Sequence, residues 1–185
     1  AADRSSDDAT RRSLLIGDAE RVETTARFRV AGDLSKAMRL DELRIEIQPK
    51  VATTDGRVTG AECLLRWTHP NLGEISPIEI VKAAKSSQKL LELDCWVLRK
   101  ALNFISSCRH LGNNYGRLSV NLSGFTLSSP NFPKWLELQL ATFGVAGSEL
   151  DIEILESAVF EDFEQILAAM RTIHALGVSF SLDDF

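Results

Sequence analysis

Apolar residues along the chain change repeatedly between helical spacing and strict alternation. Val30, Leu34 and Met38 lie at helical spacing, and the alternating segment LRIEIQP at 43–49 follows them, which predicts a helix and then a strand. Further strands are predicted at 57–67, 117–123, 150–156 and 178–185, with helical segments at about 76–110, 129–144 and 163–176. Strands separated by helices predict an α/β fold with a mainly parallel sheet, whereas the turn TTDG predicts a hairpin between the first two strands.

Each predicted strand carries polar residues on one of its two faces. A half-solvated antiparallel sheet gives the same alternation and stays an alternative, although the intervening helices favour parallel crossovers. In the parallel arrangement the polar faces line a common cavity, and their most acidic positions fall at the carboxyl ends of the strands, where α/β barrels hold their active sites. These positions are Glu62, Asn121, Glu153 and Asp183.

Three carboxylates and an amide oxygen at one place predict a metal site. The carboxylates would repel one another unless a hard cation lay between them, and an all-oxygen ligand set favours Mg²⁺ or Mn²⁺. Adjacent Asp183 and Asp184 provide ligands for two ions. Arg66 shares the face of Glu62 and is placed to bind the anionic substrate that such ions attract.

Composition limits the classes of function. The 185 residues, 44% of them apolar, suffice for one core, so we expect a linker or flexible segment at 1–26 and one domain at 27–185. A net charge of −5 without a basic run argues against binding of a nucleic-acid polymer. No apolar stretch is long enough to span a membrane, so we expect a cytoplasmic segment without membrane contact, although a longer parent protein can still be membrane-attached.

Five motifs carry a resemblance to a known family. The segments IQPKV, GAECLLRWTHPNLG, SVNLS, DIEILES and SLDDF resemble, in order, the motifs of EAL domains, the bacterial cyclic di-GMP phosphodiesterases. The resemblance runs from about residue 28 to the end of the chain. It implies a modified TIM (β/α)8 barrel whose first strand runs against the others, present here through about the fifth strand.

The resemblance also implies roles for individual residues. Metal ligation falls to Glu62, Asn121, Glu153, Asp183 and Asp184, and contacts with cyclic di-GMP fall to Gln48, Leu64 and Arg66. The catalytic set is Glu62, Asp183, Asp184 and Glu156, of which Glu156 is similar to the glutamate that steadies the loop after the D-D-F motif.

Some positions depart from the family pattern. Cys63 replaces the alanine of the E-A-L signature, and Lys82, Lys85 and Gln88 replace a proline, an acidic residue and a glycine. The family's later catalytic lysine lies beyond Phe185, so a polypeptide that ends there is expected to be inactive.

The function implied for the complete domain is hydrolysis of cyclic di-GMP to linear pGpG with two Mg²⁺ or Mn²⁺ ions. The alternative is a catalytically inactive EAL domain that acts as a cyclic di-GMP receptor or a protein-interaction module. Expected partners besides the dinucleotide are a second copy of the chain and an upstream sensory or GGDEF-type domain, coupled through the N-terminal helix.

Overall fold

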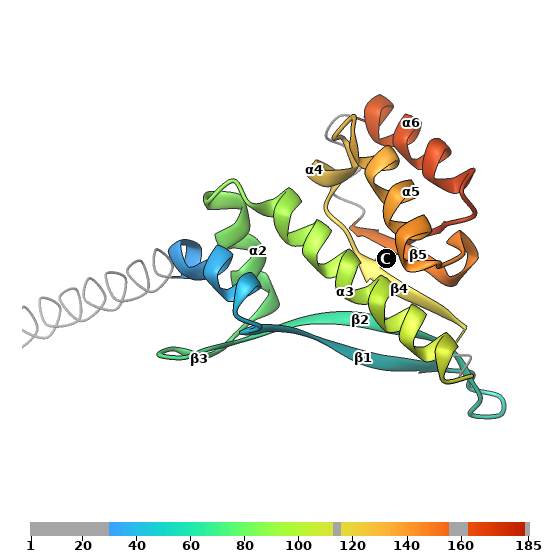
Figure 1. The fold of residues 1–185 in the computed structure, drawn as a ribbon, viewed down its shortest axis with the longest axis horizontal. Helices are drawn as coiled ribbons and strands as arrows, with labels where there is room; N and C mark the ends of the chain where they lie inside the picture. The colour runs from blue at the N-terminus through green and yellow to red at the C-terminus, as the bar shows by residue number, and fades with distance from the viewer. Residues whose placement is uncertain (1–29, 113–115, 156–162, 184–185) are drawn as a thin grey trace, which may run out of the picture.

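The computed structural model describes residues 30–112, 116–155 and 163–183, so the linker predicted at 1–26 lies outside the described residues. A helix over 30–39 is followed by alternating strands and helices (Figure 1). The elements are β1 (Leu43–Val51), β2 (Val58–His69), β3 (Gly73–Ile75), α2 (Pro77–Ser86), α3 (Leu90–His110), β4 (Arg117–Asn121), α4 (Gly124–Leu127), α5 (Phe132–Phe143), the 3₁₀ turn η1 (Gly147–Glu149), β5 (Leu150–Leu155), α6 (Phe163–His174) and β6 (Ser179–Asp183).

The described strands form one six-stranded sheet in the order β1-β2-β4-β5-β6, with β3 paired to β2. β1 and β2 are antiparallel, and β2–β4, β4–β5 and β5–β6 are parallel. The predicted α/β fold, its opening hairpin and its reversed first strand are therefore confirmed, and the wholly antiparallel alternative is wrong. The sequence prediction omitted β3, whose three residues are too few to show a period.

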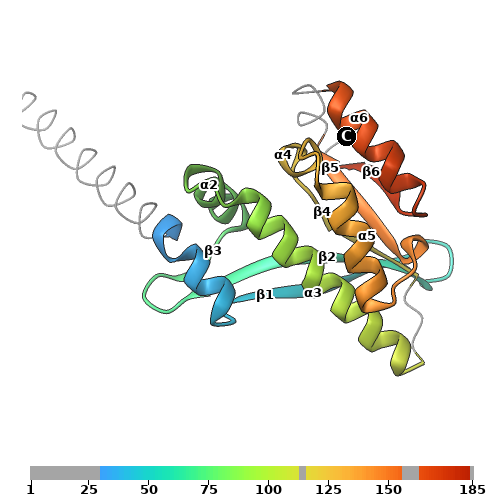
Figure 2. The same cartoon turned by 45° about the horizontal axis from the view of Figure 1, so that its top comes forward.

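The helices cover the apolar face of the sheet (Figures 1 and 2). Leu118, Val120, Ile152 and Ile154 are almost completely buried and belong to one core with apolar residues of α3, α5 and α6. The polar residues of the same strands point to the opposite face, because side chains alternate along a strand. None of the described helices is both long and apolar enough to cross a membrane.

Helix α2 begins and ends as its sequence dictates, with one strained residue. Ser76 caps it and forms a capping box with Glu79. At its end, the Gln88 amide donates to the Lys85 carbonyl and the Lys89 amide to the Ala84 carbonyl, which is the Schellman pattern. Gln88 has a φ of 57°, the left-handed conformation that glycine adopts most easily. This explains why glycine is the usual residue at the C′ position of a Schellman motif.

Replacing Gln88 by Gly should therefore stabilise the protein. The relief of left-handed strain, offset in part by the greater freedom of glycine in the unfolded chain, predicts a free energy of unfolding higher by about 0.5–1 kcal/mol. Urea denaturation measures the change. Lys85→Gly, an exposed position inside the same helix, is the matched control and should lower the stability by about 1 kcal/mol. A destabilised Gln88→Gly variant would contradict the strain interpretation.

Candidate functional site

Strand register sets the polar residues in rows across the uncovered face of the sheet. In the first row Gln48, Glu62, Ser119, Asp151 and Ser179 are successive Cα partners on β1, β2, β4, β5 and β6. Partners in register point to the same face of a sheet. The second row consists of Asn121, Glu153 and Ser181. The common polar face predicted from alternation is therefore present.

Glu62 and Asn121 form the central contact of this face. The Asn121 side-chain amide donates to Glu62 Oε1 at 3.0 Å, which joins the first row to the second. Parallel pairing of β2 with β4 ends beside this contact, at Cys63 and Val120. Glu62 is half-buried and Asn121 is exposed, so both remain accessible to a ligand on this face.

Glu153 lies beside a cation that the sequence analysis did not single out. The Lys50 ammonium lies 2.5 Å from Glu153 Oε1 and 2.8 Å from Ser119 Oγ. Ser119 Oγ in turn donates to Asp151 Oδ2 at 3.3 Å, and Ser181 Oγ donates to the same oxygen at 2.7 Å. Glu153 is only 7% exposed. The position of Lys50 two residues after Gln48, on the same face of an alternating strand, was the available sequence signal.

The residues predicted to contact the substrate lie on β1 and β2. Gln48 is exposed and Leu64 is half-buried, and both share the face of Glu62. Arg66 Nε donates to Glu46 Oε2 at 2.9 Å, and Nη1 donates to the Leu65 carbonyl at 2.9 Å. The guanidinium is thereby fixed at the edge of the polar face with part of its surface exposed.

The predicted metal ligands are only partly brought together. Glu62 contacts Asn121, whereas Glu153 contacts Lys50, and Asp183 ends β6 in register with Leu155. Asp184 and Glu156 lie outside the described residues. Within the described parts of the chain, no three acidic, histidine or cysteine side chains are grouped so as to hold a metal ion. The metal site stays a prediction.

Cys63 lies beside Glu62 but points to the opposite, apolar face. It is buried against the helices, and burial, followed by the neighbouring Glu62 charge, raises the pKa of its thiol to about 12. The thiol is therefore protonated at neutral pH, and its orientation keeps it away from the polar face. Cysteine in place of the signature alanine is a packing change.

Asp94 fixes the loop that follows Asn121. The Asp94 carboxylate on α3 is buried, and its Oδ2 accepts from the Ser123 hydroxyl at 2.5 Å, the Thr126 hydroxyl at 2.6 Å and the Ser123 amide at 3.2 Å. Ser123 caps α4 two residues after Asn121. The network thus joins α3 to the chain immediately after β4. A lone acidic residue among the apolar positions of α3 was the signal in the sequence.

Asp94 also makes stability depend on pH. Burial raises the pKa of the Asp94 carboxyl, although the hydrogen bonds from Ser123 and Thr126 oppose the rise. Between the unfolded value of about 3.9 and the raised folded value, the native state binds more protons, so this contribution to stability falls as the pH rises. Asp94→Asn removes the contribution. The difference in free energy of unfolding, wild type minus variant, should fall from pH 4 towards neutrality in urea titrations. A constant difference would contradict the assignment.

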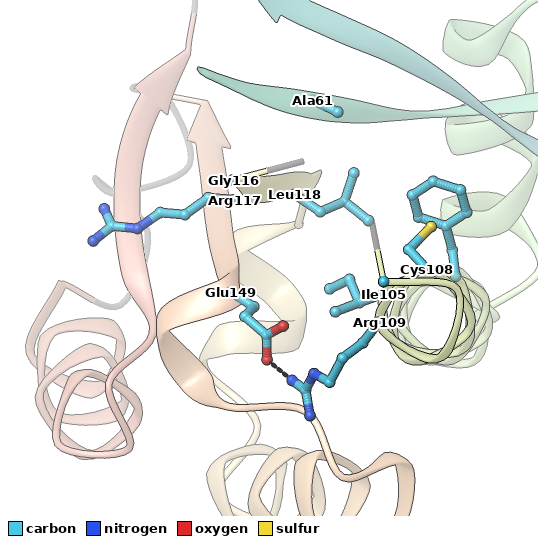
Figure 3. Close-up of a pocket in the computed structure, with 10 residues that line it drawn as sticks. Ala61, Ile105, Cys108, Arg109, Gly116, Arg117, Leu118 and Glu149 are labelled. Carbon is cyan, nitrogen blue, oxygen red and sulfur yellow. Dashed lines mark hydrogen bonds and ion pairs between the residues drawn. The ribbon is translucent and has the colours of Figure 1, made fainter. Parts of the chain in front are cut away.

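A pocket of about 380 Å³ lies on the other side of the sheet (Figure 3). Ala61 and Leu118, from the apolar faces of β2 and β4, line it together with the last turns of α3. Arg109 of α3 forms an ion pair with Glu149 of η1 at its margin. The pocket is therefore separated by the sheet from Glu62, Asn121 and Glu153.

Comparisons with known proteins agree with this description. The family model of the EAL domain matches residues 31–185. An uncharacterized signaling protein of Caulobacter vibrioides is 36% identical over 86% of this chain and 19% of its own length. The cyclic di-GMP phosphodiesterase NbdA of Pseudomonas aeruginosa is 31% identical over 89% of this chain and 21% of its own length. The chain thus spans about a fifth of these two curated relatives.

A solved structure shows the same fold. The structure described as PaMucR phosphodiesterase in complex with c-di-GMP is 29% identical, with a TM-score of 0.79 over 85% of this chain and 64% of that chain. The parallel sheet and its polar face match the TIM-barrel-like α/β fold of this structure. By the match over residues 31–185, this chain belongs to the EAL domain family.

Proposed function

We propose that the complete EAL domain binds cyclic di-GMP on the polar face formed by β1, β2, β4 and β5 and hydrolyses one phosphodiester bond to give linear pGpG. The observation that carries the proposal is the Glu62–Asn121 contact, with Glu153 beside Asn121 in the second row. Relatives named as cyclic di-GMP phosphodiesterases support the choice of substrate. A homodimer and coupling to an upstream sensory or GGDEF-type domain stay predictions.

The donor set fits a hard divalent cation. Glu62 and Glu153 provide carboxylate oxygens and Asn121 an amide oxygen, while the Cys63 thiol lies on the other face. We propose that these residues, with Asp183 and Asp184, hold two Mg²⁺ or Mn²⁺ ions. When bound, the ions would supply positive charge beside the phosphate and a more acidic water.

The chain's own residues bind and orient the dinucleotide. Arg66 has guanidinium N–H groups beyond those that bond Glu46 and Leu65, and a phosphate oxygen is the acceptor that they favour. Glu46 fixes the direction of this group before the substrate arrives, which reduces the entropy lost on binding. Gln48 and Leu64 offer a polar and an apolar contact on the same face.

Turnover of cyclic di-GMP tests the proposal. The purified complete domain incubated with cyclic di-GMP and Mn²⁺ should give pGpG as the product on ion-exchange chromatography, and excess chelator should stop the reaction. Equilibrium binding is measured on the same material. Binding without hydrolysis would overturn the catalytic assignment in favour of a receptor, and absence of binding would overturn both.

A further inference from the structure

We propose that Lys50 is an internal counter-ion that holds Glu153 while no divalent ion is bound and releases it when an ion binds. This inference rests on the metal site of the proposed function. Lys50 belongs to the IQPKV motif, but neither the resemblance nor the predicted ligand set gives it a role. The inference assigns it a positioning role.

The first argument is the geometry of the ion pair. Lys50 Nζ lies 2.5 Å from Glu153 Oε1, and it also donates to Ser119 Oγ at 2.8 Å. The Glu153 side chain is only 9% exposed, and a carboxylate that is taken out of water needs an opposite charge or several donors. Across the described residues, Lys50 is the one cation at ion-pair distance from Glu153.

The second argument is the path that the side chain takes. Lys50 is the Cα partner of Gly60, and Gly60 is the partner of Arg117 at the start of β4. Because Gly60 has no side chain, the methylene chain of Lys50 can pass over β2 and reach β4 and β5.

The third argument is competition. An ammonium group and a divalent ion both need the lone pairs of the Glu153 carboxylate, and like charges that share one carboxylate repel each other strongly in a partly buried place. The Lys50 side chain is 42% exposed, so it can leave towards solvent without unpacking the core. Metal binding therefore exchanges one cation for another at Glu153.

Manganese titration of four proteins tests the exchange. Calorimetry with Mn²⁺ is performed on wild type, Lys50→Met, Lys50→Arg and Lys134→Met. Lys134 pairs with Glu137 on the exposed surface of α5, so its replacement changes the net charge equally without touching Glu153. We expect Lys50→Met to bind Mn²⁺ at least about fivefold more tightly than wild type, because a repelling charge is removed. Lys50→Arg and Lys134→Met should stay within about twofold of wild type.

A second measurement uses wild-type protein alone and does not depend on the folding of a variant. Acetic anhydride labels lysines, and mass spectrometry reports the rate at each position. Saturating Mn²⁺ should raise the rate at Lys50 at least about threefold, because an ion-paired ammonium is released, and should leave Lys134 unchanged.

The outcomes separate the two proposals. Equal Mn²⁺ affinity of wild type and Lys50→Met, or unchanged labelling of Lys50, overturns the counter-ion role while the metal site stands. Failure of wild type and every variant to bind Mn²⁺ overturns the metal site and this inference together.

Discussion

In the complete domain, replacing Glu62 by Gln should lower the rate of cyclic di-GMP hydrolysis by at least about a hundredfold and weaken Mn²⁺ binding in parallel. Mutation of a group that only orients a metal ligand lowers metal affinity or activity about 10–100-fold. Removal of the charge from a proposed ligand should therefore lower activity by at least the upper end of that range. The substitution keeps the Oε1 atom that accepts from Asn121 at 3.0 Å, so the local structure is preserved. Turnover and calorimetric Mn²⁺ titration measure the two effects.

The matched control is Glu137→Gln on the outer surface of α5. It makes the same chemical change far from the polar face and should leave turnover and Mn²⁺ affinity unaltered. A Glu62→Gln protein that hydrolyses cyclic di-GMP at the wild-type rate would remove Glu62 from the proposed machinery.

Replacing Gly147 by Ala should strongly destabilise the fold. Gly147 begins η1, just before β5, and a Cβ at this position would lie 2.1 Å from the Leu176 carbonyl oxygen and 3.0 Å from the Val178 amide nitrogen. Both neighbours are backbone atoms, so the chain entering β5 or β6 must shift. We expect the free energy of unfolding to fall by about 3 kcal/mol.

Gly32→Ala is the matched control for this prediction. Gly32 is exposed in the helix over 30–39, and a Cβ there meets nothing within 4 Å. Alanine favours the helix, so this variant should gain up to about 1 kcal/mol. Urea denaturation of both variants gives the comparison, and equal stabilities would show that the backbone contact at Gly147 can relax without cost.

Alternation was sufficient to predict which strand residues share a face. The period of two in LRIEIQP and LDIEILE placed Gln48 and Glu153 with Glu62, and the register of the sheet shows them so. Capping chemistry located the start of α2 at Ser76, because both partners of the box lie within four residues. Interactions that are local in sequence, or that repeat with a fixed period, were thus predictable.

Contacts between distant residues were not predictable in the same way. Lys50 and Glu153 are 103 positions apart, and alternation says that both face the polar side but not that they meet. The contacts of Asp94 were not predictable for the same reason, because its partners Ser123 and Thr126 belong to another part of the chain. Short elements such as β3 and α4 show no period and depend on their neighbours.

A structure with ligand bound tests the location of the proposed site most directly. Crystals of the protein grown with Mn²⁺ and a phosphorothioate analogue of cyclic di-GMP that resists hydrolysis should show the ligand on the polar face of β1, β2, β4 and β5. A phosphate oxygen should lie within hydrogen-bonding distance of Arg66, and the ions should contact Glu62, Asn121 and Glu153. The ligand bound instead in the pocket between α3 and η1, with the polar face empty, would contradict the proposed site.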